Sequence, residues 1–382
     1  MQSILTRIAE QETLTREEAE RAMNLILTDS VSNEQIAAFL LGLRARGETL
    51  DELIGFTSVM RSHAVSVELP DHLPDDGPHE NPPAGESASH KALDIVGTGG
   101  DGFGTFNIST AATFVCAGAG ALVAKHGNRS VSSKCGSSDV LEELGVKTVL
   151  GKKGVEFCLR EVGLTFIFAP LFHPAMKYVM PVRRELAVRT CFNILGPLCN
   201  PASVRHQLVG AFTIELAETM IQILAALGAS KILAVHSDEG MDELSISGPS
   251  TVFTFSGSDN GDESGGGSVG GSRIESVGDS GGQIERETVT PSELGLEQYP
   301  IQDVIGGNAT QNAEIISSVL NGSSGAPRNI VVLNAAFALL AGEMVTSASD
   351  GIELAKESID SGRARKRLAR LVEASNDAPA QA

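Results

Sequence analysis

The first segment with the residue types of a ligand site spans residues 93–110 and reads LDIVGTGGDGFGTFNIST. Glycine lets backbone N–H groups approach an anion closely, and the unpaired N–H groups at the start of a helix favour negative charge. We expect a helix to begin near Asn107, where Asn107, Ser109 and Thr110 are available to cap it or to bind a ligand. The segment predicts a phosphate-binding turn, and the alternative is a tight strand-to-helix turn without a ligand.

Comparison with known phosphate motifs narrows the kind of anion. Gly97, Gly99 and Gly102 match the G-x-G-x-x-G pattern of dinucleotide-binding folds, but the next predicted strand ends in Lys125 and His126. A dinucleotide fold would offer Asp or Glu there to a ribose hydroxyl, so NAD is disfavoured. The Gly-Lys-Ser/Thr of a Walker loop is also missing from this turn. The sequence therefore indicates a different phosphorylated ligand.

A second segment, residues 125–139, reads KHGNRSVSSKCGSSD and leads into a helix whose predicted start is at Asp139. It brings together the positive charges of Lys125, Arg129 and Lys134 with several hydroxyl groups and glycines. Ammonium and guanidinium groups make strong charge-assisted hydrogen bonds to phosphates, and serine hydroxyls extend them. The segment predicts a diphosphate site, and the alternative is a solvated basic loop.

A third segment, residues 235–244, reads VHSDEGMDEL and follows a predicted strand. Its carboxylates are those of Asp238, Glu239, Asp242 and Glu243. Adjacent negative charges repel one another unless a cation or water separates them, and hard oxygen ligands of this kind suit Mg²⁺. The pattern fits a magnesium site and also fits a solvated acidic turn, and its pairing with two phosphate segments favours the metal.

A fourth segment, residues 172–186, carries Arg183 and Arg184 shortly after a proline, Pro181, that can end or kink a helix. In such a position one guanidinium can hold a substrate carboxylate with two hydrogen bonds. The alternative is that both arginines form surface ion pairs beside Glu185. The spacing does not choose between the two interpretations.

The elements that position these segments indicate an α/β fold. Aliphatic runs at residues 93–96, 121–124, 164–168 and 232–235 read as strands that alternate with helical patterns. Such alternation favours a mainly parallel central sheet covered by helices. Before the first strand, residues 3–64 carry apolar residues at helical spacing, with Thr15 and Ser32 as predicted helix caps.

We predict a division of the chain into a helical domain at residues 1–64, a linker at 65–91 and an α/β domain at 92–374. The linker is rich in proline, which prevents regular hydrogen-bonded structure. Residues 256–282 are nearly all small or polar and predict a disordered insertion, because they offer too little apolar surface to offset the entropy of ordering. Residues 375–382 are expected to form a tail.

Composition excludes several classes of protein. The formal net charge of −19 repels polyanions, so we expect no nucleic acid as a partner. No run of residues is long and apolar enough for a membrane span, and the N-terminus does not resemble a signal peptide, so we expect no membrane partner. The 5 cysteines show no C-x-x-C pattern, which argues against a disulfide framework or a zinc site. A cytoplasmic protein is the expectation.

Together the four segments make the chain resemble the anthranilate phosphoribosyltransferases, from the N-terminal helices to about residue 360. Residues 65–91 and 256–282 interrupt the resemblance. It implies a small N-terminal helical domain, joined by part of residues 170–192, and a larger α/β domain with a mainly parallel sheet. The implied reaction transfers the phosphoribosyl group of 5-phosphoribosyl 1-diphosphate to the amine of anthranilate, releasing diphosphate, in tryptophan biosynthesis. Mg²⁺, with two ions per active site, and a homodimer are implied as well.

The resemblance also assigns site residues. In the first segment it places at the phosphoribosyl diphosphate donor Gly97, Gly100, Asp101, Thr105, Asn107, Ile108, Ser109 and Thr110. In the second it adds Lys125, His126, Gly127, Asn128, Arg129, Ser130, Val131, Ser132, Ser133 and Ser137. Gly97, Asn128 and Arg183 match the anthranilate contacts. Ser109, Asp242 and Glu243 match the metal ligands, whereas Asp238 and Glu239 are not the matching pair.

Two other functions compete with this one. A pyrimidine nucleoside phosphorylase resembles this family in fold and transfers ribosyl groups with free phosphate, but the acidic segment and the Arg183 region favour a metal-bound diphosphate donor. A nucleic-acid-binding relative would need a basic surface. An aryl amine is weakly basic and needs no strong base before it attacks, so positioning should dominate and we assign no catalytic acid or base.

Overall fold

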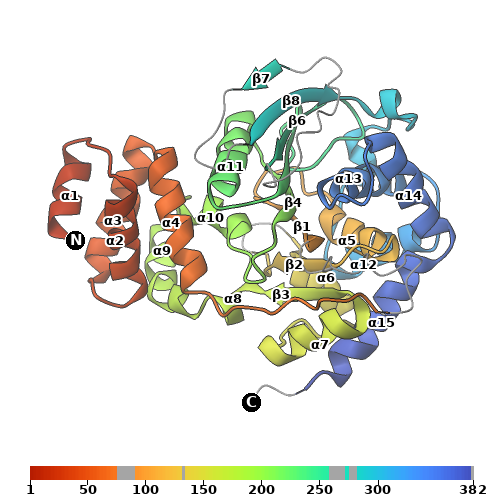
Figure 1. Cartoon of the computed structure of the whole chain (residues 1–382), viewed down its shortest axis with the longest axis horizontal. Helices are drawn as coiled ribbons and strands as arrows, with labels where there is room; N and C mark the ends of the chain where they lie inside the picture. The colour runs from red at the N-terminus through yellow and green to blue at the C-terminus, as the bar shows by residue number, and fades with distance from the viewer. Residues whose placement is uncertain (75–90, 131–133, 258–271, 275–281, 380–382) are drawn as a thin grey trace.

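The computed structural model describes residues 1–74, 91–130, 134–257, 272–274 and 282–379. A group of N-terminal helices lies at one side of a central sheet, and most of the C-terminal helices lie at the other (Figure 1). This arrangement confirms the predicted fold class, a small helical unit plus a larger α/β unit with a mainly parallel sheet.

The N-terminal unit consists of α1 (Gln2–Ala9), α2 (Arg16–Leu27), α3 (Asn33–Arg46) and α4 (Leu50–Ser62). The predicted caps Thr15 and Ser32 are confirmed, since each accepts a backbone N–H of the third helical residue and forms a capping box. A third capping box joins Thr49 and Glu52 at the start of α4. Such caps satisfy N–H groups that have no partner inside the helix, and so define where these helices begin.

Beyond α4, the chain runs extended beside the α/β unit. The backbone N–H of Val65 donates to the carbonyl of Phe172 at 2.8 Å, and that of Val67 donates to the carbonyl of Pro201 at 3.1 Å. No helix or strand occurs in residues 65–74, the part of the predicted linker that the structure describes before residue 91. This part of the linker is therefore fixed against the protein although it lacks regular structure.

The central sheet has eight strands within the described residues, in the order β3-β2-β1-β4-β5-β6-β8-β7. The strands β1 to β5 are parallel to one another, and β6, β8 and β7 extend the sheet in antiparallel fashion. Their bounds are Leu93–Gly97 for β1, Val123–Gly127 for β2, Leu164–Phe168 for β3, His206–Gly210 for β4, Lys231–Ser237 for β5, Ser250–Ser256 for β6, Ser272–Ile274 for β7 and Gln283–Val289 for β8.

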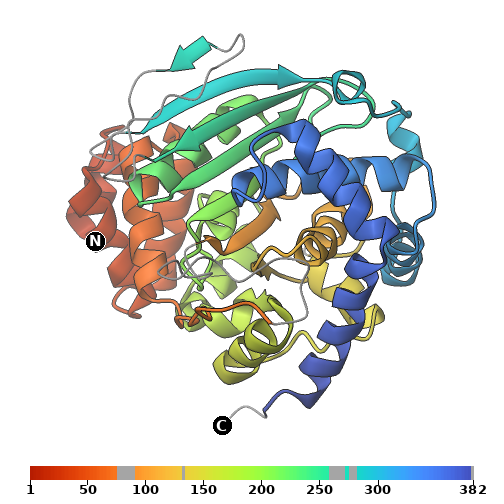
Figure 2. The same cartoon turned by 45° about the vertical axis from the view of Figure 1, so that its right-hand side comes forward.

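Helices cover both faces of the sheet (Figure 2). One core cluster packs strand residues against α5 (Ile108–Gly118), α7 (Lys152–Val162), α12 (Ala309–Leu320), α13 (Ala326–Ala341), α14 (Ala348–Asp360) and α15 (Arg363–Asp377). The other cluster joins the opposite face to α10 (Phe192–Leu198), α11 (Ile214–Ala226) and the N-terminal helices. The helical unit is thus anchored to the sheet through α10 and α11, because α4 contacts both.

The chain returns to the N-terminal helices between β3 and α10. The short helix α8 (Ala169–Phe172) leads into the 3₁₀ helix η2 (Pro174–Tyr178) and then α9 (Met180–Leu186). Contacts join η2 to α2 and α9 to α3, and Val179 and Val182 are buried in the cluster that the N-terminal helices form. This is the segment that we expected to join the helical unit.

Several sequence predictions need correction. The strand expected at 121–124 is β2, Val123–Gly127, so Lys125 lies inside a strand instead of in a loop. Residues 256–282, expected to be disordered, contain β7, which pairs with β8. The expected tail at 375–382 overlaps α15, which extends to Asp377 because buried Ser375 accepts the backbone N–H of Lys147 at 3.0 Å. In the described part of the chain, no helix combines the length and apolarity that a membrane crossing requires.

The remaining connections are α6 (Ser137–Glu143) and the 3₁₀ helices η3 (Pro291–Leu294) and η4 (Ile301–Val304). We predicted the start of α6 at Asp139, but the helix begins at Ser137, with Gly136 as its N-terminal cap residue. The Asp139 carboxylate accepts the Gly136 backbone N–H at 2.8 Å from its place in the first turn. An acidic residue in the first turn is favourable there because helix N-termini carry partial positive charge.

Candidate active site

The site begins where β1 and β4 end side by side, each in a glycine. Gly97 of β1 lies in register with Gly210 of β4. A Cβ atom added to Gly97 would lie 2.4 Å from Asp242 Oδ2, and one added to Gly210 would lie 1.7 Å from the Asp242 carbonyl oxygen. The two glycines leave the space in which the acidic loop, residues 238–244, lies over the ends of these strands. Sequence analysis missed Gly210, because a glycine between two aliphatic stretches carries no signal of its distant neighbour.

The acidic loop is hydrogen-bonded to the glycine-rich segment. Asp242 Oδ2 accepts the backbone N–H of Gly99 at 2.5 Å. Glu243 Oε1 accepts the backbone N–H of Ser109 at 3.2 Å, in the first turn of α5. Two of the predicted ligand segments, far apart in the sequence, therefore form one site, and the pair bonded to the glycine-rich segment is Asp242 and Glu243.

The back of the acidic loop is held by a buried asparagine of α13. Asn334 Oδ1 accepts the backbone N–H of Leu244 at 3.0 Å, and Asn334 Nδ2 donates to the Leu244 carbonyl at 3.0 Å. Asn334 is fully buried, so losing either bond would leave a polar group unsatisfied in the core. Sequence analysis did not single out Asn334, since an asparagine inside a helical pattern gives no indication of its partner.

Burial makes the charges of this carboxylate pair unfavourable. Burial, with the nearby Asp101 carboxylate, raises the pKa of Asp242 to about 6. Burial, with the negative charge of Asp242, raises the pKa of Glu243 to about 8. The positive charge of Lys125 opposes the rise in the pKa of Glu243. A pair of half-buried carboxylates with one lysine nearby is an environment that a divalent cation would stabilise.

The residues present fit Mg²⁺ better than a transition metal. No group of three or more His, Cys, Asp or Glu side chains able to hold a metal occurs among the described residues. Mg²⁺ does not need one, because it takes one or two carboxylates, waters and substrate phosphates as ligands. Ser109 supplies a hydroxyl, and its backbone N–H already binds Glu243. By contrast, Glu239 accepts a hydrogen bond from the Ser247 hydroxyl.

Lys125 reaches this cluster from inside the sheet. It is 2% exposed, and its Nζ donates to the Ile95 carbonyl and to Ser109 Oγ, the latter at 3.3 Å. Burial lowers the pKa of Lys125, while the negative charges of Asp94 and the acidic pair raise it. The side chain therefore places a positive charge beside the predicted metal ligands, instead of joining a solvated basic loop.

His126, the next residue of β2, faces another histidine. Its backbone N–H donates to Asp94 Oδ1 at 3.1 Å, and its ring centroid lies 5.2 Å from that of His173. Burial is the main cause that lowers the pKa of both imidazoles, that of His173 to about 4. Within the described residues, the Nε2 atoms of both rings are buried without a hydrogen-bond partner.

The second predicted donor segment uses several of its polar groups internally. Asn128 Oδ1 accepts the Arg129 backbone N–H at 2.7 Å. The Arg129 guanidinium forms ion pairs with Glu142 at 2.6 Å and Asp139 at 3.5 Å. Ser130 donates its backbone N–H to Asp139 Oδ2 at 3.1 Å. The predicted donor contacts Val131, Ser132 and Ser133 lie outside the described residues.

The glycine-rich turn is in contact with an arginine that sequence analysis missed. The Arg189 guanidinium donates to the Gly100 carbonyl and lies 4.7 Å from the ring centre of Phe212. Gly100 has a φ of +73°, a conformation that favours glycine. Within the turn, Asp101 Oδ1 accepts the backbone N–H of Phe103 at 3.1 Å. The contact with Arg189 joins the segment after α9 to the turn.

The other predicted donor residues lie at the start of helices or on the turn. Asn107 is the cap residue before α5, which begins with buried Ile108 as expected. Thr110 is fully buried, and its hydroxyl has no hydrogen-bond partner among the described residues. Thr105 forms an isolated β-bridge with Ile305. Ser137 opens α6 close to Gly127 at the end of β2.

Arg183, the predicted anthranilate contact, lies on α9. Its guanidinium lies 5.4 Å from the ring centre of Phe192 and forms no ion pair with any described residue. Burial lowers its pKa. Arg184 beside it is exposed, so the structure distinguishes two residues that the sequence could not. No described hydrogen bond joins Arg183 to Gly97 or Asn128.

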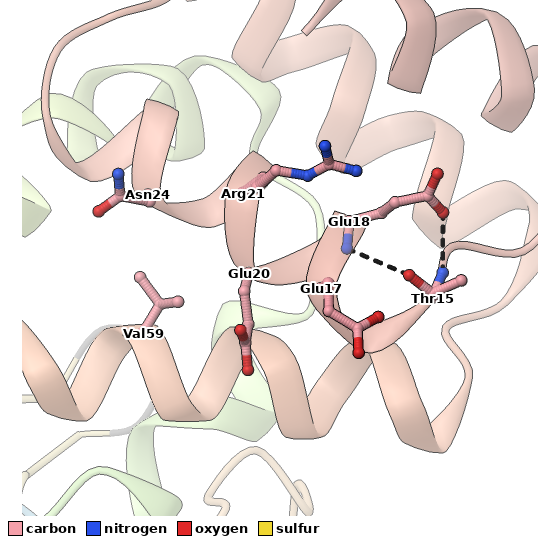
Figure 3. A pocket seen from close by; sticks show the side chains of 7 residues that line it. All are labelled: Thr15, Glu17, Glu18, Glu20, Arg21, Asn24 and Val59. Carbon is pink, nitrogen blue, oxygen red and sulfur yellow. Dashed lines mark hydrogen bonds between the residues drawn. The ribbon is translucent and has the colours of Figure 1, made fainter.

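A shallow hollow on the N-terminal helices is not part of this site. It is lined by Thr15, Glu17, Glu18, Glu20, Arg21, Asn24 and Val59, from α2, its cap and α4 (Figure 3). Its Thr15 and Glu18 are engaged in the α2 capping box. Because it shares no residue with the predicted ligand segments, we place the chemistry at the strand ends.

Known protein families match both units of the chain. Residues 2–64 match the glycosyl transferase family, helical bundle domain, and residues 89–264 and 268–365 match the glycosyl transferase family, a/b domain. The anthranilate phosphoribosyltransferase of Salinibacter ruber is 47% identical over 100% of both chains.

Solved structures are similar as well. The crystal structure of anthranilate phosphoribosyltransferase from Thermus thermophilus has a TM-score of 0.81 at 34% identity, covering 98% of this chain and 99% of that one. The enzyme from Saccharomyces cerevisiae in complex with PRPP and Mg has a TM-score of 0.78 at 25% identity, covering 98% and 97%. The same yeast protein in complex with 4-fluoroanthranilate has a TM-score of 0.76 at 25% identity, covering 98% of each chain.

Proposed function

The chain belongs to the anthranilate phosphoribosyltransferases, and we propose that the reaction takes place over the ends of β1 and β4. There the phosphoribosyl group of 5-phosphoribosyl 1-diphosphate (PRPP) passes to the amine of anthranilate and diphosphate leaves, a step of tryptophan biosynthesis. One observation carries the placement: half-buried Asp242 and Glu243 accept backbone N–H groups of Gly99 and Ser109, in the segment that predicts phosphate binding.

The donor occupies the glycine-rich turn and the loop after β2. Its contacts are the residues expected from the sequence, in the ranges 97–110 and 125–137. Support comes from the left-handed conformation of Gly99, Gly100, Gly102 and Gly104, which exposes backbone groups along the turn. The start of α5 also carries the partial positive charge of a helix N-terminus, which suits a phosphate.

Asp242, Glu243 and Ser109 hold Mg²⁺, with two ions per active site as the family resemblance implies. When bound, the metal supplies positive charge against the diphosphate. Support comes from the raised pKa values of the two carboxylates and from the position of Lys125 beside Ser109. The yeast relative, which is described in complex with PRPP and Mg, supports the same cofactor.

The protein's own residues contribute charge and position. As the bond between ribose C1 and diphosphate breaks, positive charge builds on the sugar and negative charge on the leaving group. Lys125 and the N-terminus of α5 offset the negative charge. The aryl amine attacks C1 without first being deprotonated by a base, so the enzyme's contribution is to hold the amine close to C1 in the direction of attack.

Anthranilate is held by Arg183, Asn128 and the backbone at Gly97. Arg183 suits the carboxylate because its guanidinium forms no ion pair within the described chain and is partly removed from water. A guanidinium makes two parallel hydrogen bonds to a carboxylate, which fixes orientation as well as position. The yeast relative in complex with 4-fluoroanthranilate supports this class of acceptor.

A cytoplasmic homodimer is the proposed state of the protein. All cysteines of the chain are free and buried, which suits a reducing compartment. Two elements that pack together, α3 and the segment around α9, expose Leu41 at 50%, Met180 at 39% and Val188 at 48%. Light scattering on the wild type and on Leu41→Glu tests this: a monomeric wild type contradicts the homodimer.

A fluorescence assay tests the reaction itself. Anthranilate fluorescence should fall only when PRPP and Mg²⁺ are both present, and removal of the metal by a chelator should stop the decay. Replacing PRPP with a pyrimidine nucleoside and free phosphate should give no reaction. Turnover with nucleoside and phosphate, and none with anthranilate, would identify the chain as a phosphorylase instead.

A further inference from the structure

A buried asparagine of α12, Asn312, is hydrogen-bonded to the predicted donor site although no comparison or motif assigns it a role. It is 2% exposed. Its Oδ1 accepts the backbone N–H of Gly307 at 2.7 Å, and its Nδ2 donates to Asn107 Oδ1 at 2.9 Å. Asn107 Nδ2 in turn donates to the Cys135 carbonyl at 3.2 Å. Three bonds thus connect α12, the cap of α5 and the loop after β2.

The two end groups of this series of hydrogen bonds determine the direction of every bond in it. The backbone N–H of Gly307 can only donate, so Asn312 must present its oxygen there and its NH₂ group to Asn107. Asn107 must then present its oxygen to Asn312 and its NH₂ group to the carbonyl of Cys135, which can only accept. Because both terminal groups belong to the backbone, only one orientation of the two side-chain amides satisfies every bond.

The backbone around Gly306 reinforces the connection. Gly306 donates its N–H to the Gly104 carbonyl at 2.8 Å, and Phe106 donates its N–H to the Val304 carbonyl at 3.1 Å. A Cβ atom on Gly306 would lie 2.7 Å from Asn312 Oδ1 and 2.7 Å from Phe106 N. The glycine-rich turn, residues 304–307 and Asn312 are therefore packed too closely for one to move alone.

We propose that Asn312 is a positioning residue for the phosphoribosyl diphosphate donor, because it fixes the side-chain amide of Asn107 and, through it, the loop that ends at Cys135. The proposal rests on the proposed function, which makes Asn107 a donor contact. Asn312 itself does not touch the donor. Its effect is to leave the second N–H hydrogen and second lone pair of the Asn107 amide in a defined direction for the ligand.

Asn312→Asp is the most informative variant. The carboxylate keeps the size of the side chain and still accepts the Gly307 N–H, but it cannot donate to Asn107. The Asn107 amide must then either lose this bond or turn over and present its oxygen to the Cys135 carbonyl. Donor affinity, measured by calorimetry with Mg²⁺ and PRPP, should fall by about tenfold or more, because the variant loses the buried hydrogen bond from residue 312 to Asn107. The anthranilate KM should stay within about threefold of the wild-type value, because Asn312 does not contact the acceptor residues.

Two further variants separate positioning from charge and from stability. In an Asn107→Ala background the amide is gone, so Asn312→Asp should change donor affinity by less than about threefold. If the added carboxylate merely repels diphosphate, its effect persists in that background. Ile316→Ala, a buried change on the same helix, should lower the melting temperature without changing donor affinity.

The outcomes are distinct. Tenfold weaker donor binding in Asn312→Asp that vanishes in the Asn107→Ala background supports the proposal. Wild-type donor affinity in Asn312→Asp overturns it while leaving the proposed function intact, and so does an equal loss of affinity in Ile316→Ala. A wild type that binds no PRPP overturns the proposed function and this inference with it.

Discussion

Gly210 lies directly against Asp242, so that a single methyl group on Gly210 would stand 1.7 Å from the Asp242 carbonyl oxygen. The contact joins the end of a central strand to the loop that carries the acidic pair. A similar contact exists on the neighbouring strand, between Gly97 and the Asp242 carboxylate. The position of the proposed metal site is therefore determined by the absence of side chains on two adjacent strands.

Gly210→Ala should displace the acidic loop, because the Asp242 backbone leaves the new methyl group no space. A displacement of about 1 Å at reacting groups lowers turnover by on the order of 100-fold. Turnover and its dependence on Mg²⁺ concentration measure the effect. Gly342→Ala is the control, since its nearest new contact would be an ordinary 3.5 Å. Equal turnover in both variants would show that the loop does not need this glycine.

Arg183→Ala should raise the anthranilate KM by about tenfold or more and leave the PRPP KM within about threefold. The reason is that a charge-assisted hydrogen bond to a carboxylate contributes roughly 1.5–3 kcal/mol. Arg184→Ala, beside it on α9 but exposed, should change neither constant. Steady-state kinetics with each substrate varied in turn make the comparison. Reversal of the two results would transfer the acceptor role to Arg184.

His173 should make stability depend on pH. Its pKa falls from 6.5 in the unfolded chain to about 4 in the fold, because burial disfavours the charged ring. Above about pH 6.5 the ring is neutral in both states, so His173 does not lower the free energy of unfolding. As pH falls toward about 4, only the unfolded chain takes up the proton, and the free energy of unfolding decreases. At about pH 5.5 the loss from this residue is roughly 1.4 kcal/mol.

Denaturant unfolding at about pH 7.5 and about pH 5.5, on either side of the ordinary histidine pKa, measures this loss. The wild type should lose more stability than His173→Gln, which has no titrating ring. Because the pKa of His126 is lowered in the same direction, the variant should retain part of the pH dependence. Identical pH dependence in the two proteins would mean that His173 is not buried as the structure describes.

The sequence predicted the elements whose signal is local. Helix caps at Thr15 and Ser32 and the strand at 164–168 depend on residues next to one another, and the structure has them at the predicted positions. The central strand β4 was missed because it begins with His206 and Gln207. Both are buried, and each satisfies its side chain with a distant backbone carbonyl, that of Ala341 and that of Pro197.

The residues of the site divide in the same way, into those with a local sequence signal and those without one. Residue types within one segment indicated phosphate and metal ligands, and the family resemblance selected Asp242 and Glu243 from the four acidic residues of the loop. The partners that hold these ligands could not be read from the sequence. Gly210 and Asn334 contact the acidic loop through pairings that only the register of the sheet and the packing of α13 create. A single sequence states residue types but not which distant residues meet.

The acidic pair offers a test that separates activity from stability. Since the folded pKa values of Asp242 and Glu243 are about 6 and about 8, above their ordinary values, the fold must keep protons that the unfolded chain releases. Without metal, these two groups therefore lower stability as pH rises from about 4 to 8. Asp242→Asn with Glu243→Gln removes this effect while the amide oxygens can still accept the Gly99 and Ser109 N–H groups.

At about pH 8 without metal, the double variant should melt at or above the wild-type temperature, yet its turnover should be abolished across a magnesium titration. The wild type should gain melting temperature when Mg²⁺ and PRPP are added, and the variant should gain little, because only the charged carboxylates bind the cation. Asp238→Asn with Glu239→Gln is the matched control from the same loop, and its turnover should stay within about threefold of wild type, since the Glu239 side chain bonds to Ser247 instead of the glycine-rich turn.

Near-normal turnover of the Asp242 and Glu243 double variant at ordinary Mg²⁺ would refute the metal site. If the variant is inactive but its melting temperature still rises with Mg²⁺ and PRPP as much as that of the wild type, the pair has only a structural role in holding Gly99 and Ser109.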